Sequence, residues 1–295
     1  MAERTNLEAN GWTAFWNRGG WWRAVGVAVA YLAVYQLLPL IVQPLSNGVV
    51  DPEDLFATPG SVFFGLALPV ILGSIVLVVF AWSIGWFPRP LFSRQPVRGS
   101  WWMWIAPVLV VIPIVLRLIG IDYGAYSPGV IAMTFVAGAF IGLSEELLTR
   151  GIAVTLLRRC GYREWAVALL STLIFALLHS TNLFTGQPLT TVGFTLLYTF
   201  AFGILMYLTL RATGNLIWPI ILHALTDPTT FLATGGIDQA SAAAENPALI
   251  LAGPATFLLI AGALVLLIFI RGDAQGRAAA GEADEADDAP APRTA

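Results

Sequence analysis

The chain has 295 residues, of which 57% are hydrophobic and 11% are charged, with a formal net charge of −3. A soluble domain carries about 25% charged residues, so this composition excludes an ordinary soluble protein and predicts an all-α, polytopic membrane protein with one lipid-embedded helix bundle. All 15 basic residues are Arg, which excludes Schiff-base and Ser/Lys mechanisms, and the single Cys160 permits no internal disulfide. No basic patch interleaved with aromatic residues indicates nucleic-acid binding.

Eight apolar segments follow a polar N-terminal region that lacks the apolar run of a cleavable signal peptide. Most of them reach or approach the roughly 20 residues that a helix needs to cross a bilayer. We predict a cytoplasmic segment at 1–20, a bundle of about eight transmembrane helices at 21–271, and a disordered acidic tail at 272–295. The apolar segments lie near residues 22–42, 61–86, 102–121, 129–157, 165–179, 190–210, 216–231 and 247–270.

Arginine placement supports this topology independently. Thirteen of the 15 arginines fall at the termini or in alternate connections, whereas the intervening connections contain acidic residues and no arginine. The positive-inside rule therefore places both termini in the cytoplasm. Most tryptophans flank the arginine-bearing ends, as an interfacial belt requires. Only Arg117 and Arg150 lie inside predicted helices.

The fourth apolar segment contains Glu145, Glu146 and Arg150. Each such residue costs roughly 2.5–3.5 kcal/mol near the centre of a membrane helix, so the three must be paired or functional. Glu146 and Arg150 are four residues apart and can pair within the helix. Glu145 is rotated by about 100° from Glu146 and needs another partner. Gly138 and Gly142 have the small-xxx-small spacing that lets a second helix approach closely. The plain alternative is a structural ion pair beside one protonated glutamate.

The chain has two histidines, and both lie in apolar segments. Asp227 follows His223 by four residues and shares its helical face. Counting 1.5 Å per residue from the nearest arginines places Glu145 about 20 Å and His179 about 24 Å into the bundle, so they are level. The same count from Asn215 places His223 only about 12 Å deep, so either the preceding connection is sunk in the bundle or the helix is tilted. Helix–helix hydrogen bonding is the plain alternative role for such histidines.

A carboxylate and two histidines in a dry pocket could hydrolyse an amide without a cofactor, a metal or a covalent nucleophile. Glu145 with His179 could take a proton from an attacking water. His223 could donate to the developing oxyanion, which is usually the largest stabilising contribution in acyl transfer. Glu146 and Arg150 would then keep the helix face in place.

Three segments of the chain resemble the CPBP family of intramembrane proteases, which includes type II CAAX prenyl endopeptidases and bacteriocin-processing or immunity proteins. The family pattern is Glu-Glu-x-x-x-Arg, then Phe-x-x-x-His, then His-x-x-x-Asn or a similar residue, on successive membrane helices. The residues that match it are Glu145, Glu146, Arg150, Phe175, His179, His223 and Asp227, preceded by Asn215, Leu216, Trp218 and Pro219.

The resemblance implies a glutamate-dependent endopeptidase. Glu145 and His179 would activate water, His223 and Asp227 would form the oxyanion hole, and Glu146 with Arg150 would support them. Two residues depart from the family. Thr149 replaces a frequent aromatic residue, which we interpret as a packing difference. Asp227 replaces Asn, and because an ionised Asp repels an oxyanion, we expect it to orient His223 as a charged partner rather than to be protonated.

Three alternatives remain at this point. A zinc protease could use Glu145, His179 and His223 as ligands, although the His-Glu-x-x-His motif is absent. A proton-coupled transporter could use the same groups as a relay. A catalytically inactive member could act as an immunity or scaffold protein. For the enzyme we expect membrane lipid and a protein or peptide substrate as partners, with either a prenylated or an unprenylated substrate, and a location in the cell membrane.

Overall fold

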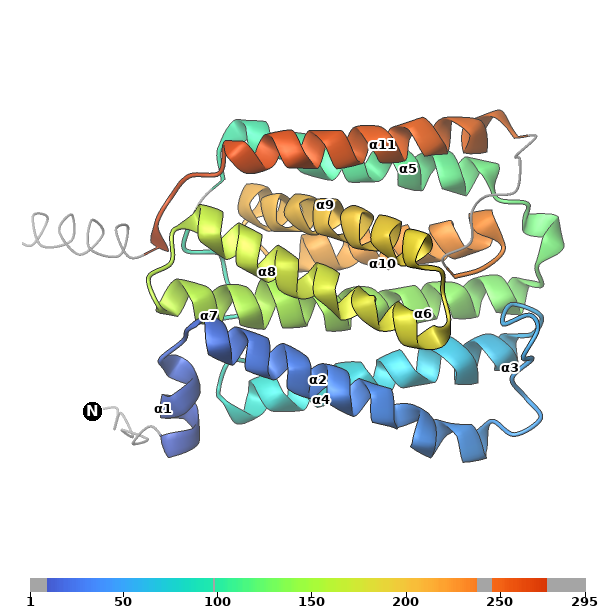
Figure 1. Ribbon diagram of the computed structural model, residues 1–295, viewed down its shortest axis with the longest axis horizontal. Coiled ribbons are helices and arrows are strands. Elements are labelled where there is room, and N and C mark those ends of the chain that lie inside the picture. The colour runs from blue at the N-terminus through green and yellow to red at the C-terminus, as the bar shows by residue number, and fades with distance from the viewer. Residues whose placement is uncertain (1–9, 98, 238–245, 275–295) are drawn as a thin grey trace, which may run out of the picture.

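The computed structural model describes residues 10–97, 99–237 and 246–274, and in these ranges the chain forms helices and loops without a strand. The predicted disordered tail therefore lies almost entirely outside the described residues. Figure 1 shows the long helices packed side by side along the long axis of the molecule. The α-helices are α1 (Gly11–Asn17), α2 (Trp21–Val42), α3 (Pro59–Val62), α4 (Leu68–Ser83), α5 (Ile105–Gly120), α6 (Pro128–Glu146), α7 (Val154–Arg159), α8 (Glu164–Leu178), α9 (Leu189–Thr213), α10 (Ile217–Thr234) and α11 (Pro247–Ile268).

Six shorter helical segments extend or join these helices. Two π-helices, Phe63–Ala67 and Leu147–Ala153, make α3–α4 and α6–α7 continuous helical runs. The four 3₁₀ segments are Gln43–Leu45, Trp101–Trp104, Tyr123–Ala125 and His179–Thr185.

Seven helical runs in the described residues are long and apolar enough to span a membrane. They correspond to seven of the eight predicted segments, so the prediction of a polytopic helical bundle is confirmed and the protein is an integral membrane protein. The eighth segment forms α10 but is less apolar, because it carries His223, Asp227 and several threonines. It tolerates these groups because it packs against α5, α6 and α9 within the bundle.

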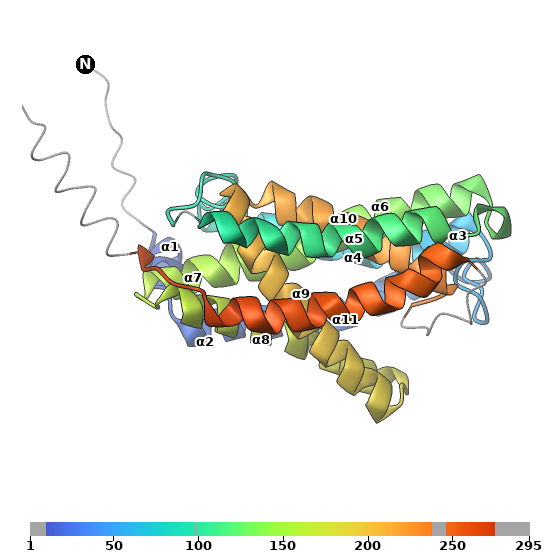
Figure 2. The same ribbon diagram turned by 90° about the horizontal axis from the view of Figure 1, so that it is seen from above.

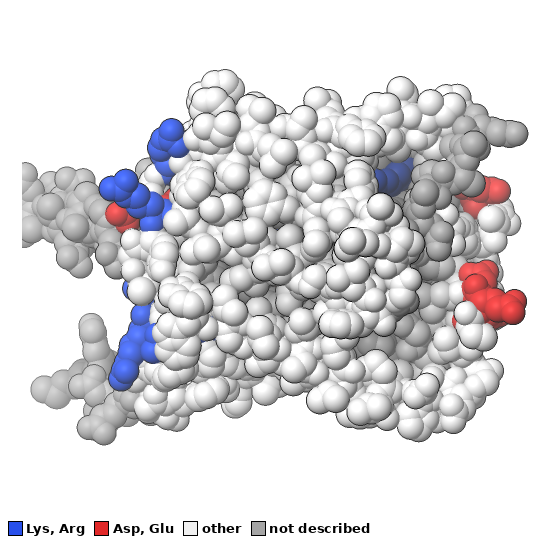
Figure 3. All heavy atoms as spheres, viewed as in Figure 1, with Lys and Arg blue, Asp and Glu red and all other residues white. Residues whose placement is uncertain are grey.

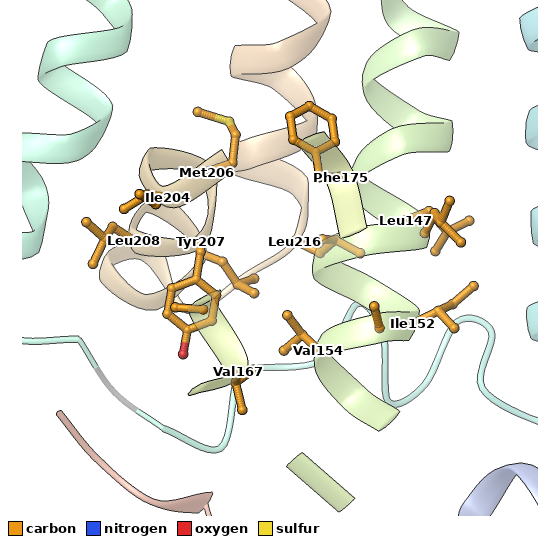
Figure 4. Close-up of a cluster of buried hydrophobic side chains, with 14 of the residues drawn as sticks. Leu147, Ile152, Val154, Val167, Phe175, Ile204, Met206, Tyr207, Leu208 and Leu216 are labelled. Carbon is orange, nitrogen blue, oxygen red and sulfur yellow. The ribbon is translucent and has the colours of Figure 1, made fainter. Parts of the chain in front are cut away.

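The π-helix Leu147–Ala153 lies in the core of the bundle. All seven residues of this segment are buried. Figure 4 shows Val154 on the side of the helix that faces Tyr207 and Val167, whereas Leu147 and Ile152 point to the opposite side. A helical segment that is buried on every side must be apolar on every side, so the single charged residue within it, Arg150, needs an internal partner.

Charge is segregated between the two ends of the bundle, and Figure 3 shows basic residues at one end and mainly acidic residues at the other. At the basic end, Glu164 accepts hydrogen bonds from Arg158 at 2.7 and 2.8 Å, from Arg211 at 2.9 Å and from the Tyr207 hydroxyl. This buried network ties α7, α8 and α9 together at the end that the positive-inside rule assigns to the cytoplasm.

The connection between α9 and α10 is covered by the loop that follows α4. Gln95 N–H donates to Gly214 O at 2.9 Å, Gly99 N–H to Arg211 O at 2.8 Å, and Asn215 Nδ2 to Phe92 O at 3.3 Å. The loop after α4 therefore covers the start of α10 at the cytoplasmic end of the bundle. This supports the first explanation for the apparent depth mismatch of His223, a connection sunk in the bundle.

Helices α6 and α10 approach closely at two glycines, as the small-xxx-small spacing predicted. A Cβ atom on Gly142 would lie 2.7 Å from Ala224 N and Ile220 O, and one on Gly138 would overlap Pro228. Because the opposing atoms at Gly142 belong to the backbone, only glycine allows this approach. The contact brings the acidic end of α6 against the histidine of α10.

Candidate active site

Glu145 and Glu146 form the last turn of α6, directly before the π-helix Leu147–Ala153. Single-turn π-helical insertions occur frequently at functional sites. Both carboxylates reach the same imidazole: Glu146 Oε1 lies 2.8 Å from His223 Nδ1, and Glu145 Oε2 lies 3.7 Å from His223 Nε2. Glu145 has the separate partner that its rotation predicted, His179, but it also shares His223 with Glu146, because one ring presents a nitrogen to each carboxylate.

His223 is closely enclosed, with its side chain only 3% exposed. The rings of Phe202 and Phe175 contact it edge-on, at centroid distances of 4.9 and 5.9 Å. Its Nδ1–H donates to Glu146, which fixes the orientation of the ring. Its Nε2 lies 3.6 Å from Asp227 Oδ2, which is longer than a hydrogen bond. Asp227 is therefore a charged partner of His223, as expected, while Glu146 makes the direct hydrogen bond to the ring.

His179 stands at the end of α8, where the chain changes to the 3₁₀ segment His179–Thr185. Figure 2 shows that the joined ends of α8 and α9 project from the side of the bundle. The Nδ1 atom of His179 lies 3.1 Å from the carbonyl oxygen of Phe175. A carbonyl only accepts, so Nδ1 carries the proton and a neutral ring leaves Nε2 as an acceptor. That Nε2 lies 4.0 Å from Glu145 Oε2, which agrees with their predicted equal depth.

Arg150 confirms the predicted pairing along α6, because its Nη1 lies 3.1 Å from Glu146 Oε1. The pair is not self-contained, since the same oxygen also accepts from His223. The guanidinium lies 4.5 Å from the centre of the Phe175 ring, and a Cβ on Gly203 would lie 2.7 Å from its Nη2. Thr149, expected to be only a packing difference, also forms hydrogen bonds. Its hydroxyl accepts a hydrogen bond from Arg150 and donates one to the Glu145 carbonyl oxygen, both at 2.6 Å.

The site is open on one side and closed on the other. The side chains of Glu145, His179 and Asp227 are 28%, 24% and 25% exposed, whereas Glu146 and Arg150 are fully buried. Glu145 Oε2 itself is buried and has no hydrogen-bond partner. The arrangement leaves one carboxylate oxygen facing two imidazole nitrogens, with access from the partly exposed side.

The sequence pattern did not indicate that α2 contributes to the site. Tyr31 and Tyr35 of this helix lie within electrostatic range of Glu145. Their spacing of four residues on an otherwise apolar helix was the available signal, but nothing local indicated which helix they would face.

The proposed zinc ligands were Glu145, His179 and His223. Across the ranges that the structure describes, no group of three His, Cys, Asp or Glu side chains is arranged to hold a metal ion. The Nδ1 atoms of both histidines are already engaged by Phe175 and Glu146, which leaves only their Nε2 atoms for any ligand.

The site residues all fall within one segment that has known relatives. Residues 127–229 match the Rce1-like family of type II CAAX prenyl endopeptidases. The match confirms the resemblance inferred from the three motifs, and it runs from the N-cap of α6 to just beyond Asp227 in α10. Comparison with curated proteins and with solved structures gives no match. The matched segment is less than half of the 295 residues, and it indicates a CAAX-type intramembrane protease in general.

Proposed function

We propose that the protein is an intramembrane endopeptidase that hydrolyses a peptide bond with water activated by Glu145 and His179. The supporting observation is the convergence of two imidazole Nε2 atoms, at 3.7 and 4.0 Å, on a Glu145 oxygen that has no hydrogen-bond partner. The reaction needs no metal and no covalent enzyme intermediate.

Water activation follows from the protonation pattern of His179. A separation of 4.0 Å is too long for a direct hydrogen bond and allows a bridging water. Such a water donates one hydrogen to Glu145 and the other to the His179 Nε2 lone pair, so its own lone pair faces the substrate carbonyl. Glu145 takes the proton as the new C–O bond forms.

The developing oxyanion is stabilised by His223. Its Nδ1–H donates to Glu146, so the ring must be an imidazolium for Nε2–H to donate to the substrate oxygen. Glu146 and the nearby Asp227 favour this positive charge. Removing one donor of this kind typically costs about 10²–10³ in kcat.

Collapse of the tetrahedral intermediate completes the reaction. The C–N bond breaks, and Glu145 passes the proton taken from water to the leaving amine. The products are a carboxyl-terminal peptide and an amino-terminal peptide with a new carboxylate. Glu146 and Arg150 position His223 throughout.

The substrate class has two candidates. The family match favours a prenylated C-terminal peptide of CAAX type. Processing of another membrane peptide, such as a bacteriocin leader, is the second candidate. In both cases the substrate reaches the partly exposed side of the site from within the cell membrane, with both termini of the enzyme in the cytoplasm.

The deciding experiment measures peptide cleavage by purified protein in liposomes, with and without a zinc chelator. We expect cleavage by the wild type that resists the chelator, and none by Glu145→Gln. Loss of cleavage in chelator, restored by zinc, would replace this mechanism with the zinc alternative. Proton-driven flux without cleavage would establish the transporter alternative. Comparing membrane peptides in cells that express wild type or Glu145→Ala would identify the natural substrate.

A further inference from the structure

Arg117 is the second arginine inside a membrane helix, and the proposed reaction does not use it. It lies in the last turn of α5 and is 8% exposed. Its Nη2 donates to Thr256 Oγ1 on α11 at 3.3 Å, whereas its Nη1 is buried without a hydrogen-bond partner. None of the ion pairs among the described residues includes Arg117. A buried cation with an unpaired donor is costly, which indicates that a ligand completes it.

Two aromatic rings connect Arg117 to the candidate active site. Phe202 contacts His223 at a centroid distance of 4.9 Å. Tyr198, one turn before Phe202 in α9, stacks on Phe202 at a centroid distance of 6.0 Å. Tyr198 lies within electrostatic range of both Arg117 and Asp227. Arg117 therefore belongs to a second polar layer, displaced from His223 toward the extracytoplasmic end of the bundle.

Asp227 does not neutralise the guanidinium of Arg117 through an ion pair. Asp227 Oδ2 lies 3.6 Å from His223 Nε2 and forms no ion pair with Arg117 within the described chain. Arg150 differs in this respect, because it is paired with Glu146 and enclosed by Phe175 and Gly203. Arg150 also has two donors, Nε and Nη2, without a hydrogen-bond partner, but its charge is compensated by Glu146, whereas Arg117 forms no ion pair among the described residues.

We propose that Arg117, assisted by the Tyr198 hydroxyl, binds the C-terminal α-carboxylate of the peptide substrate. This inference rests on the proposed peptidase function. A guanidinium matches a carboxylate with two parallel hydrogen bonds, and the pair is strong where water is excluded.

The separation of the two layers agrees with this role. The ring steps from His223 to Phe202 and from Phe202 to Tyr198 are 4.9 and 6.0 Å. An extended peptide advances roughly 3.3–3.6 Å per residue, so a carboxylate held beside Tyr198 lies within about three residues of a carbonyl held at His223. The enzyme then cleaves at a short, fixed distance from the carboxyl terminus of its substrate.

The test compares two prenylated peptides that are identical except for a free C-terminal carboxylate or a C-terminal amide. Cleavage by purified protein in liposomes is followed by mass spectrometry. We expect wild type to favour the carboxylate by about 10- to 100-fold in kcat/KM, as for hydrogen bonds to a charged group. Arg117→Met should bring this ratio close to one, Arg117→Lys should retain part of it, and the control Arg271→Met should leave it unchanged.

Two results would overturn the proposal: equal cleavage of both peptides by wild type, or an unchanged ratio in Arg117→Met. A third peptide, an amide with Glu as its last residue, tests whether a side-chain carboxylate serves equally well, which would also contradict α-carboxylate recognition. The wild-type comparison remains decisive if Arg117→Met does not fold, and Tyr198→Phe should lower the ratio several-fold.

A binding measurement separates this inference from the proposed reaction. Anisotropy of the labelled peptides with Glu145→Gln protein requires no turnover. If no form of the protein cleaves peptide but the carboxylate form binds more tightly in an Arg117-dependent way, the hydrolytic mechanism fails and carboxylate recognition stands. If cleavage occurs and the two forms bind equally, carboxylate recognition alone fails.

Discussion

Glu164 and Glu145 are two glutamates of one bundle with opposite surroundings. Glu164 is fully buried and accepts from Arg158, Arg211 and the Tyr207 hydroxyl. Glu145 is partly exposed, and its Oε2 faces two imidazole nitrogens without a hydrogen bond. A carboxylate whose lone pairs are filled by cations cannot accept a proton from water, whereas one with a free oxygen can. In the proposed mechanism, the occupancy of these lone pairs, rather than the depth of burial, separates the structural carboxylate from the reactive one.

The largest expected effect is on turnover in Glu145→Gln. The amide keeps the size of the side chain but cannot accept the proton, so kcat for peptide cleavage should fall by about 10³- to 10⁴-fold. The midpoint of thermal unfolding should change little, because Glu145 Oε2 has no bond to lose. The matched control is Glu53→Gln in an exposed loop, which should keep wild-type turnover. Substantial activity in Glu145→Gln would remove Glu145 from the mechanism.

Glu164→Gln should lower the stability of the protein but leave its turnover nearly unchanged, the reverse of Glu145→Gln. Removing one partner from a buried ion network costs about 3–5 kcal/mol, because the remaining charges lose their compensation. Arg158 and Arg211 would be left facing a neutral amide. Thermal unfolding in detergent should begin at a clearly lower temperature, while turnover per folded molecule stays near that of wild type. If turnover per folded molecule fell as far as in Glu145→Gln, the division between the two carboxylates would not hold.

What could be predicted from the sequence was mostly local. The Glu146–Arg150 pair and the small-xxx-small contact follow from helical spacing, and both are present in the structure. The three motifs meet because each one places its polar group on one face of a helix that is otherwise apolar. Such periodic signals need no knowledge of how the helices are arranged.

What could not be predicted depends on contacts between distant segments. The bond from His223 to Glu146 requires the exact height of α10, which is set by hydrogen bonds from the loop after α4 to Gly214 and Asn215. The π-helix Leu147–Ala153 changes the helical phase after Glu146, and no residue pattern in the chain indicates it. The spacing alone therefore left two explanations open for the depth of His223, although its helix and its partner helix were correctly predicted.

Gly142→Ala tests whether the close approach of α6 and α10 is needed to hold the reactive geometry. The added Cβ would lie 2.7 Å from backbone atoms of α10, so the helices must separate by some tenths of an ångström. Overpacking of this kind costs about 1–3 kcal/mol, and turnover should fall roughly tenfold as the Glu146–His223 bond lengthens. Gly26→Ala, where an added Cβ has no neighbour within 4 Å, is the matched control for both unfolding temperature and turnover. An unchanged kcat in Gly142→Ala would show that the site tolerates a shift of α10.

Asp227→Asn should have the smallest effect, because Glu146 already holds the imidazole of His223. Asp227 Oδ2 is 3.6 Å from Nε2, so it contributes charge rather than a hydrogen bond. The asparagine removes this charge, which disfavours the imidazolium, but supplies an amide N–H that can donate to the oxyanion. Because the two changes oppose each other, kcat should change by less than about tenfold, and Asp227→Ala, which supplies no donor, should be less active than Asp227→Asn. The measurement is kcat for both variants at saturating peptide. If Asp227→Asn were as inactive as Glu145→Gln, then Asp227 would belong with the reactive carboxylates, and the orienting role assigned to Glu146 would have to be shared.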